Sequence, residues 1–515
     1  MTGMRAGLRS PTWWCWSFVF LGIVLRVAHV ARQPALWHDE AALVLNVIYL
    51  PVDECFGKLL HHEASPPLFL VLERLTMHVL GDSETALRMP VLVLGCVALI
   101  LFTYSARKLL PPWLATLAVA LFACSDRLIW HAAEAKPYTV DVFVAVVTIA
   151  GFVRTRDWPL RWQCMLWMVF LPVAEWFSFP ACFVAGGLLV ALLWEIVALS
   201  LRERIARLAQ PEASDLSPEP ALLTSRGARG LRASWPDLLS YCLLGITVVG
   251  SFVALAFGPA KAQQDGAMTD CWVNQFADWS QPGFVPIWGI ASTAEVLRYA
   301  LMPLGQLLTP IAIAGAIRIG KRDRRLLTVL LVPLTLSLVA ALLGKYPYGG
   351  VRVSVFAAPA LILLVAAGTT PCWNWLQKSC RFAPLVLAIA LALPTGQSLY
   401  RVVMPWPRID FRDAVTFTRG QLRESDLIAS DHWEVLYYMR DQPDQLCDIA
   451  EIADRQPPRV WVLTGTDPGI AEARISRVPA DYHQVDARVF PGTIVVCFEH
   501  RPQSATSTSA GPTIP

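Results

Sequence analysis

The sequence predicts an all-α polytopic membrane protein that carries a small α/β domain at its C-terminal end, outside the membrane. Of its 515 residues, 55% are hydrophobic, and the mean hydropathy is +0.47. Soluble globular domains are less apolar than this. Apolar stretches of about 20 residues, the length that crosses a bilayer as a helix, recur along most of the chain. From about residue 400 these stretches stop, and shorter, more polar patterns follow.

The apolar stretches indicate about eleven membrane-spanning helices. The expected spans are 13–31, 90–107, 113–130, 138–153, 162–178, 180–200, 238–258, 300–318, 326–343, 353–369 and 383–399. We leave out SPPLFLVLERLTMHVL (65–80), because it is short and places Glu73, Arg74 and His78 on one helical face. That pattern favours a helix lying in the membrane interface, within the first outer loop.

The distribution of Lys and Arg indicates the orientation of the chain. With a cytoplasmic N-terminus, the cytoplasmic loops hold roughly twice as many Lys and Arg as the outer loops before residue 400, as the positive-inside rule requires. The basic start, MTGMRAGLRS, leads into an apolar run without a small-residue cleavage site, so we expect a retained first span. We therefore expect a multi-pass protein of the plasma membrane (the inner membrane of a bacterium), with an extracytoplasmic C-terminal domain.

The C-terminal part divides into a folded domain and a tail. We expect a transmembrane domain over 1–400, the small extracytoplasmic α/β domain over 401–501, and a disordered tail over 502–515. LIASD and RVWVLTG are typical of short strands, and DHWEVLYYMRD of a helix. Two cysteines of this domain, Cys447 and Cys497, could form a disulfide outside the cytoplasm, which the sequence leaves open.

Composition also excludes some classes of function. The net charge is only +3, which gives no support for nucleic-acid binding. The 12 cysteines are scattered, many of them within apolar runs, without the spacing of a metal site. The partner that the composition does indicate is the lipid bilayer.

Two neighbouring carboxylates follow the first span. The stretch LWHDEAAL (36–43) contains Asp39 and Glu40, which on a helix would point about 100° apart, so that only one of them faces a given site. Glu134, in HAAEAKPY, is expected on the same outer face. Taken alone, each could be a solvated charge at the end of a span. Together they are candidates for catalytic acidic residues.

Three outer cations stand where helices begin, against the helix dipole and the positive-inside bias. Arg88 and Lys136 each precede a span, and Arg352 stands at the start of another. Pairing with nearby carboxylates, Glu84 for Arg88 and Glu134 for Lys136, would explain two of them singly. Three such cations on one face favour a shared anion, such as the phosphate of a donor at the membrane surface.

The same loops supply candidates for contacts with substrate: His62, Glu63, Tyr138 and Tyr348. The run His61-His62-Glu63 only weakly resembles a metal cluster, and we assign no metal ligand from the sequence.

An ordered set of motifs resembles one family. Arg26 near the end of the first span is followed by WHDEAAL, SPPLFLVLERL, GDSETALRMPVLVLG and AAEAKPYTVD. This order is similar to the C-type glycosyltransferase superfamily, in its branch of dolichyl-phosphate-mannose protein mannosyltransferase-like proteins, which includes bacterial transferases that add aminoarabinose or other sugars to lipid A and core saccharides. The resemblance covers about residues 13–200, and KYPYGGVRVSVFAAPALILLVAAG is similar to a later loop and span.

The resemblance implies a polyprenyl-phosphate-sugar-dependent glycosyltransferase acting on an extracytoplasmic acceptor, which is a protein, lipid A or a cell-envelope glycan. It implies that Asp39 is the catalytic acidic residue and that Glu134 is a second acidic position. Two departures leave the donor sugar open. Ser65-Pro66-Pro67 stands where the family has His-Pro-Pro, and Lys136 stands where Arg is common.

The implied chemistry matches these residue types. A phosphate leaves without a general acid, so the reaction needs a base, here Asp39 with Glu40 orienting it, and cations that hold the phosphate. A single displacement of this kind inverts the anomeric centre. A divalent ion, Mg or Mn, between Asp39 and Glu134 is compatible with the residues but not required by them.

The alternative reading is a transporter or flippase of a phosphorylated (glyco)lipid. It predicts ionisable residues at mid-membrane, and often internal repeats. Here the ionisable residues gather at one surface, and we detect no repeat. A non-catalytic scaffold for an envelope complex is a third class, against which the presence of both Asp39 and Glu134 argues.

Overall fold

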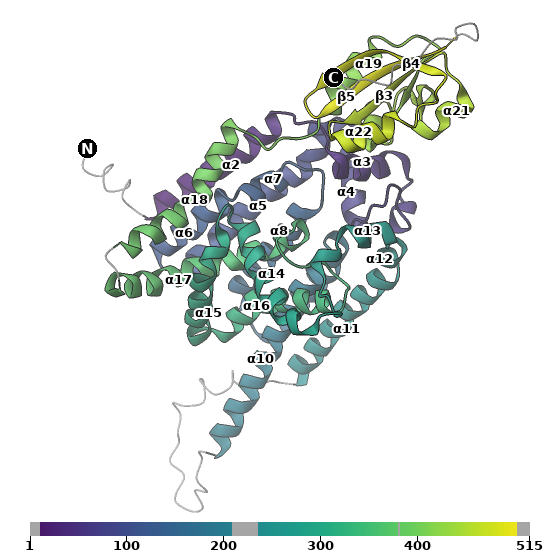
Figure 1. Cartoon of the computed structure of the whole chain (residues 1–515). Helices are drawn as coiled ribbons and strands as arrows, with labels where there is room; N and C mark the ends of the chain where they lie inside the picture. Colours follow the sequence, from purple (N-terminus) through teal and green to yellow (C-terminus); the bar gives the residue numbers. More distant parts are fainter. Residues whose placement is uncertain (1–10, 209–234, 380–381, 502–515) are drawn as a thin grey trace, which may run out of the picture.

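The computed structural model describes residues 11–208, 235–379 and 382–501. A bundle of helices forms most of it, and a five-stranded sheet domain is stacked on one end of the bundle (Figure 1). This confirms the predicted fold class. The predicted tail over 502–515 lies outside the described residues, and the expected domain boundary near residue 400 remains a prediction.

The helices of the bundle follow one another along most of the chain. They are α2 (Pro11–Ala31), α3 (His38–Tyr49), α4 (Pro67–Leu80), α5 (Glu84–Leu109), α6 (Pro112–Ala123), α7 (Asp126–His131), α8 (Tyr138–Thr155), α9 (Leu160–Phe177), α10 (Ala181–Leu208), α11 (Trp235–Phe257), α12 (Pro259–Ala262), α13 (Gly266–Cys271), α14 (Val285–Ala300), α15 (Thr309–Arg322), α16 (Arg324–Leu342), α17 (Ala358–Ser379) and α18 (Ala383–Val403). Short 3-10 turns join some of them, among which η3 (Val273–Gln275) and η6 (Arg352–Ala357) bear on the site.

Eight helices of the described chain are long and apolar enough to cross a membrane, and a bent pair adds a ninth if it counts as one span. All eleven expected segments are helical, but three do not qualify as straight spans. The segment 113–130 is broken into α6 and α7, α9 is not among the eight, and 300–318 falls in the bent pair Pro282–Ala300 and Gly305–Arg322, whose arms meet at 110°.

Two helices form the centre of the bundle. In α8, 78% of the most apolar 18-residue stretch is buried, and the buried share of the corresponding stretch in η6 with α17 is 83%. At the periphery, this share is only 17% for α11 with α12. Contact between α15 and α17 depends on Gly315 and Gly368, because a Cβ on either glycine would overlap the backbone of the opposite helix. The central helices matter for function, since α8 begins at Tyr138 and η6 at Arg352.

The segment 65–80 forms α4, whose 14 residues are too few for a span. The prediction that it does not span is therefore confirmed. Its polar face differs from the expectation, since Glu73 is 1% exposed and neither carboxylate oxygen has a hydrogen-bond partner among the described residues. Burial, with Glu40 nearby, holds the pKa of Glu73 well above its usual range. Arg74 donates to the carbonyl oxygens of Val47 at 2.8 Å and of Leu50, and so fastens α4 to the end of α3.

The C-terminal domain is a mixed sheet with helices on both faces (Figure 1). Its elements are α19 (Phe411–Arg419), β1 (Leu427–Ala429), α20 (Trp433–Tyr438), β2 (Leu446–Cys447), α21 (Ile452–Arg455), β3 (Arg459–Gly465), α22 (Pro468–Ile475), β4 (Tyr482–Phe490) and β5 (Thr493–His500). The strand order is β2-β1-β3-β5-β4, with β2, β1 and β3 parallel to one another and β5 antiparallel to both β3 and β4. The strands and the helix expected from the sequence are all present.

The two cysteines of this domain do not form a disulfide. Cys447 lies in β2 and Cys497 in β5, and both are buried free thiols. Because β1 and β3 lie between β2 and β5, the two residues are three strand spacings apart, about 14 Å. That exceeds the reach of a disulfide.

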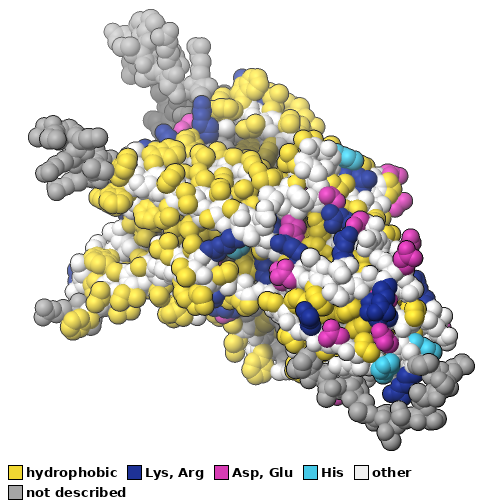
Figure 2. Space-filling model, turned by 90° about the horizontal axis from the view of Figure 1, so that it is seen from above, with side chains coloured by type: hydrophobic (Ala, Val, Ile, Leu, Met, Phe, Trp, Pro, Cys, Tyr) yellow, Lys and Arg dark blue, Asp and Glu magenta, His cyan; other side chains and the backbone are white. Residues whose placement is uncertain are grey.

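The C-terminal domain rests on α3 through α20. The hydroxyl of Tyr438 accepts from the Leu36 amide at 3.0 Å, and that of Tyr437 donates to the Asp82 carbonyl oxygen at 2.7 Å. Tyr437 also packs with buried Leu36 and Leu45 in one apolar cluster. Seen from above, charged side chains gather over this end of the molecule, while apolar side chains cover much of the remaining surface (Figure 2). The helix with the two candidate carboxylates is therefore enclosed between the bundle and the C-terminal domain.

Candidate active site

Asp39 lies in the first turn of α3, where the helix dipole favours a negative charge. Its carboxylate forms an ion pair with the guanidinium of Arg352, at the start of η6. That guanidinium also lies over the rings of Trp37, Tyr138 and Trp272, at 5.3, 5.8 and 5.3 Å from the ring centroids. The side chains of Asp39 and Arg352 remain 22% and 29% exposed. The pair is thus held in place and still accessible to a substrate.

A second ion pair lies beside the first. The Nζ atom of Lys136 is 2.5 Å from Oε2 of Glu63, and the two side chains are 3% and 11% exposed. Burial raises the pKa of Glu63, the charge of Lys136 opposes this effect, and the negative charge of Asp39 adds to it. The structure therefore brings five predicted residues together, which we call the Asp39 cluster: Asp39, Glu63, Lys136, Tyr138 and Arg352.

Glu40 has different partners and is fully buried. It accepts from Nε of Arg88 at 2.9 Å and from Nη2 at 2.8 Å, a two-pronged contact. Nη1 of Arg408 donates to Glu40 at 3.1 Å, and the Ala135 amide at 2.9 Å. We call these residues the Glu40 cluster: Glu40, Arg88, Ala135 and Arg408. It joins α3, α5, the loop before α8 and the segment that leads into the C-terminal domain.

The partners of Arg88 differ from both groups that the sequence suggested, which were the Glu84 carboxylate and a donor phosphate. Its side chain is 0% exposed and also donates to the carbonyl oxygens of Pro34 and Ala35. Glu84, expected as its partner, instead binds Arg412 and the Tyr438 hydroxyl of the C-terminal domain. The guanidinium of Arg88 is therefore enclosed by groups of the protein, in contrast to that of Arg352.

Glu134 is buried in a third set of contacts. It accepts from Nε1 of Trp130 and lies 2.7 Å from Nδ1 of His131, whose Nε2 is 2.8 Å from the Tyr299 hydroxyl. Burial acts to raise its pKa, but the charge and hydrogen bond of His131 outweigh burial and lower it to about 2. Lys136 pairs with Glu63 rather than with Glu134, so the predicted partner was wrong.

The two remaining substrate-contact candidates are held by other groups. His62 is 58% exposed, and its Nδ1 is 2.5 Å from Oδ2 of Asp265. The hydroxyl of Tyr348 is 2.9 Å from that of Thr293, and its amide donates to the Gln275 carbonyl oxygen at 3.1 Å. Tyr348 thereby fixes the η3 turn, which directly follows Trp272 of the Arg352 aromatic cage.

Two site residues were not found from the sequence. Arg408 reaches Glu40 across 368 residues of chain, and Trp272 lies in a loop without any matched motif. Arg408 also stacks on Trp130, with its guanidinium 4.1 Å from the ring centroid. No periodicity or spacing in the sequence links these residues to the first outer loop.

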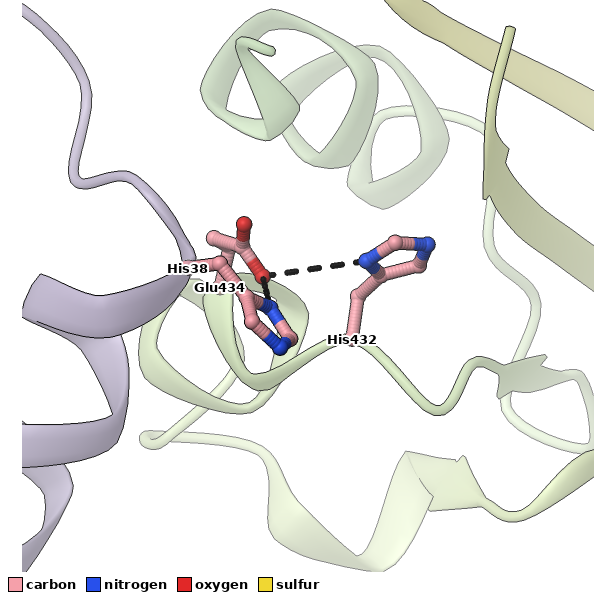
Figure 3. Close-up of side chains that lie close together, drawn as sticks. All are labelled: His38, His432 and Glu434. Carbon is pink, nitrogen blue, oxygen red and sulfur yellow. Dashed lines mark hydrogen bonds and ion pairs between the residues drawn. The ribbon is translucent and has the colours of Figure 1, made fainter. Parts of the chain in front are cut away.

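A further group of side chains lies where α3 meets α20. The ligand atoms of His38, His432 and Glu434 are within 4.8 Å of one another (Figure 3). Nδ1 of His38 is 3.2 Å from Oε2 of Glu434, and Nδ1 of His432 is 3.8 Å from the same oxygen. Residues of this type can bind a transition metal.

The surroundings of His432 do not fit a metal ion. Its Nε2 lies 2.6 Å from Nη1 of Arg474. Arginine can only donate, so Nε2 accepts and the proton stays on Nδ1, the atom that a metal would need. Burial, reinforced by Arg474, lowers the pKa of His432 to about 4. A hard ion between Asp39 and Glu134 fits no better, since each carboxylate already has its own cationic or donor partners.

Comparison with known proteins identifies the fold. No protein-family model matches the sequence, and no curated protein matches it. The structure is similar to ArnT from Cupriavidus metallidurans in the apo state, with a TM-score of 0.54 and 12% identity, covering 94% of this chain and 98% of that one. ArnT bound to undecaprenyl phosphate gives a TM-score of 0.51 at 12% identity, with the same coverage.

An archaeal structure matches at a similar level. The oligosaccharyltransferase of Archaeoglobus fulgidus in the apo form has a TM-score of 0.51 and 12% identity, covering 96% of this chain and 75% of that one. At such identities the likeness concerns the fold. The chain therefore shares the fold of ArnT and of the archaeal oligosaccharyltransferase, as expected for the polytopic fold that its motifs predicted.

Proposed function

From this fold, we propose that the chain is a membrane glycosyltransferase that moves a sugar from a polyprenyl-phosphate donor to an extracytoplasmic acceptor: a protein, lipid A or a cell-envelope glycan. The observation that carries the proposal is the Asp39 cluster, in which an accessible carboxylate pairs with Arg352 beside the ion pair of Lys136 with Glu63, at the ends of central helices. The binding of undecaprenyl phosphate by ArnT, which shares the fold, supports a donor of this kind.

Asp39 acts as the base. It takes the proton of the acceptor hydroxyl or amine, while the acceptor atom bonds to the anomeric carbon and the bond from that carbon to the phosphate oxygen breaks. Polyprenyl phosphate leaves with the bonding electron pair, and the anomeric centre inverts. Lys136 and Arg352 stabilise the charge that grows on the leaving phosphate. No step requires a divalent ion such as Mg or Mn.

The free protein holds these groups in pairs that a donor can exchange. A phosphate competes with Asp39 for Arg352 and with Glu63 for Lys136, so that donor binding releases the Asp39 carboxylate for its role as base. Tyr138 packs against the Arg352 guanidinium and keeps it in place. His62 and Tyr348 act at the rim of the site, His62 as an exposed contact for substrate and Tyr348 by fixing the η3 turn.

Glu40, Arg88 and Glu134 support the site. Glu40 holds the start of α3 through Arg88 and Arg408, and so sets the position of its neighbour Asp39. Glu134 holds the loop that precedes α8 through Trp130 and His131. We therefore assign Arg88 to this framework and leave the donor phosphate to Lys136 and Arg352.

The proposed orientation places the Asp39 cluster and the C-terminal domain outside the cytoplasm, in a plasma (inner) membrane. Single-cysteine variants in a background without reactive cysteines test it. A membrane-impermeant thiol reagent should label exposed Ser83→Cys in intact cells and should label Lys108→Cys, at the far end of α5, only after permeabilisation. The opposite labelling pattern would mean that the chain has the opposite orientation in the membrane.

The lipid-linked sugars of cells test the function. Cells that lack the protein should accumulate one polyprenyl-phosphate sugar and lose that sugar from an envelope acceptor. The wild-type chain should reverse both changes, and Asp39→Asn, produced at the same level, should reverse neither. If Asp39→Asn restores both, the proposal fails. Redistribution of an unchanged lipid between leaflets would instead support the transporter alternative.

A further inference from the structure

A groove lies about one membrane thickness from the Asp39 cluster. Helix α8 begins at Tyr138 in that cluster and ends at Thr155, and its 18 residues rise by about 27 Å. The hydrocarbon core of a bilayer is about 30 Å thick. Arg156, directly after the helix, pairs at 3.6 Å with Asp323, the residue between α15 and α16. The α15–α16 turn therefore lies at the membrane boundary opposite the Asp39 cluster.

The groove opens beside this turn, between α10, α15 and α16, and has a volume of about 540 Å³. Most of its lining is apolar or small. Gly320 leaves one wall open, because a Cβ there would lie only 2.7 Å from the Leu327 side chain. The lining residues are Trp194, Ala316, Ile317, Gly320, Lys321, Arg324, Leu327 and Thr328.

Two other arginines near the groove are held by partners inside the protein, but its own cations are not held by any group that the structure describes. Arg325 pairs with Glu195 at 2.5 Å, and Arg318 donates to the Ala367 carbonyl oxygen at 3.2 Å. Lys321 and Arg324 are exposed, and neither forms an ion pair with any residue in the described ranges. Two uncompensated positive charges thus lie at the mouth of an apolar groove.

We propose that this groove binds an anionic phospholipid of the leaflet opposite the Asp39 cluster. The lipid phosphate contacts Lys321 and Arg324, and an acyl chain lies along Trp194, Ile317 and Leu327. Basic pockets between transmembrane helices bind anionic headgroups in this way, and tryptophan is favoured at the same depth. The apolar walls distinguish a lipid from a free phosphate ion, which would use only the two cations.

Lipid binding to the purified full-length protein tests the proposal. Phosphatidylglycerol and phosphatidylcholine with identical chains would be titrated in detergent, and bound lipid counted by native mass spectrometry. Two cations, each contributing about fivefold, should give roughly a 25-fold preference for phosphatidylglycerol. The variant Lys321→Gln/Arg324→Gln should lose most of this preference.

The matched control is Arg107→Gln/Lys108→Gln, which removes two exposed cations from the last turn of α5, outside the groove. It should retain the preference. Equal loss of the lipid preference in both double variants would overturn the proposal, because it would show that general surface charge attracts the lipid. Competition by inorganic phosphate as strong as that by the lipid would overturn it in favour of a plain anion site. Absence of any preference in the wild-type protein would also overturn it.

Discussion

The Asp39 cluster and the Glu40 cluster begin at adjacent residues of one helix turn, yet their surroundings differ in almost every respect. Asp39 is partly exposed and shares a single guanidinium, which itself lies in a cage of aromatic rings. Glu40 is fully buried. Its two oxygens accept hydrogen bonds from four donors in three separate parts of the chain, in addition to the one from the Trp37 amide. One carboxylate can exchange its partner for a substrate, whereas the other cannot do so without opening the fold.

This difference shows how one short motif can serve both chemistry and structure. On a helix, neighbouring side chains diverge by about 100°, so the first can face a site while the second faces the protein. A buried ion pair contributes little net stability, but breaking it leaves an uncompensated charge. The Glu40 cluster therefore fixes the position of α3, and in the proposed function the Asp39 cluster carries out the reaction.

The sharpest test of the comparison is Asp39→Asn. Asparagine keeps the shape of the side chain but cannot accept the acceptor proton, so sugar transfer should fall by roughly 10²–10⁴-fold. The measurement is transfer from a polyprenyl-phosphate sugar in membranes, normalised to inserted protein. The thermal midpoint should change little. Near-normal transfer in this variant, together with an inactive Glu40→Gln that is as stable as the wild type, would show that the base is Glu40.

Glu40→Gln should act mainly on stability. It leaves the guanidinium groups of Arg88 and Arg408 buried beside a neutral amide, and breaking such a pair typically costs about 3–5 kcal/mol. The thermal midpoint of unfolding in detergent should therefore drop clearly. Arg88→Ala should show a similar loss. A normal midpoint in both variants would mean that the Glu40 cluster does not hold the fold.

Lys136→Ala and Arg352→Ala should weaken the use of donor. A charge-assisted contact with phosphate contributes about 1.5–3 kcal/mol, so the donor concentration needed for half-maximal transfer should rise roughly ten- to a hundredfold. Acceptor dependence should change less. If both single variants and the double variant keep the wild-type donor dependence, these cations serve only to pair with Asp39 and Glu63.

The smallest effect expected is a pH dependence at the contact between α3 and α20. Burial acts to lower the pKa of His38, but the hydrogen bond and charge of Glu434 raise it above its ordinary value of 6.5. The protonated pair therefore stabilises the contact fully below pH 6.5 and is lost as the pH rises through the higher folded-state value. The protection factors of the α20 amides, which correct for the rise of intrinsic exchange with pH, should fall over that window.

Two variants sharpen this measurement. Glu434→Gln should remove the pH dependence, because the raised pKa depends on its charge. His432→Asn should leave the dependence in place, since His432 is already neutral with a pKa lowered to about 4. Protection factors that stay constant across the window in the wild type would contradict the assignment of His38.

Local patterns in the sequence were sufficient for much of the fold and part of the site. Apolar stretches and alternation found the helices and strands, and the outer loops supplied all five members of the Asp39 cluster. The same patterns could not show that 113–130 breaks before Ser125, whose hydroxyl caps α7, or that Glu73 is buried. The partners of Arg88 and Lys136 also depend on which loops meet in three dimensions, as does the distant Arg408.

The ion pair between Asp39 and Arg352 has a kinetic consequence. In the proposed mechanism, the Arg352 guanidinium occupies the Asp39 carboxylate until a donor binds, so a water molecule that arrives first is not activated. A bound donor, by drawing Arg352 to its phosphate, would free the carboxylate to act as the base. Turnover should then follow a compulsory order, with the lipid-linked sugar first and the acceptor second. Premature hydrolysis of the activated sugar would be limited to the interval between those two arrivals.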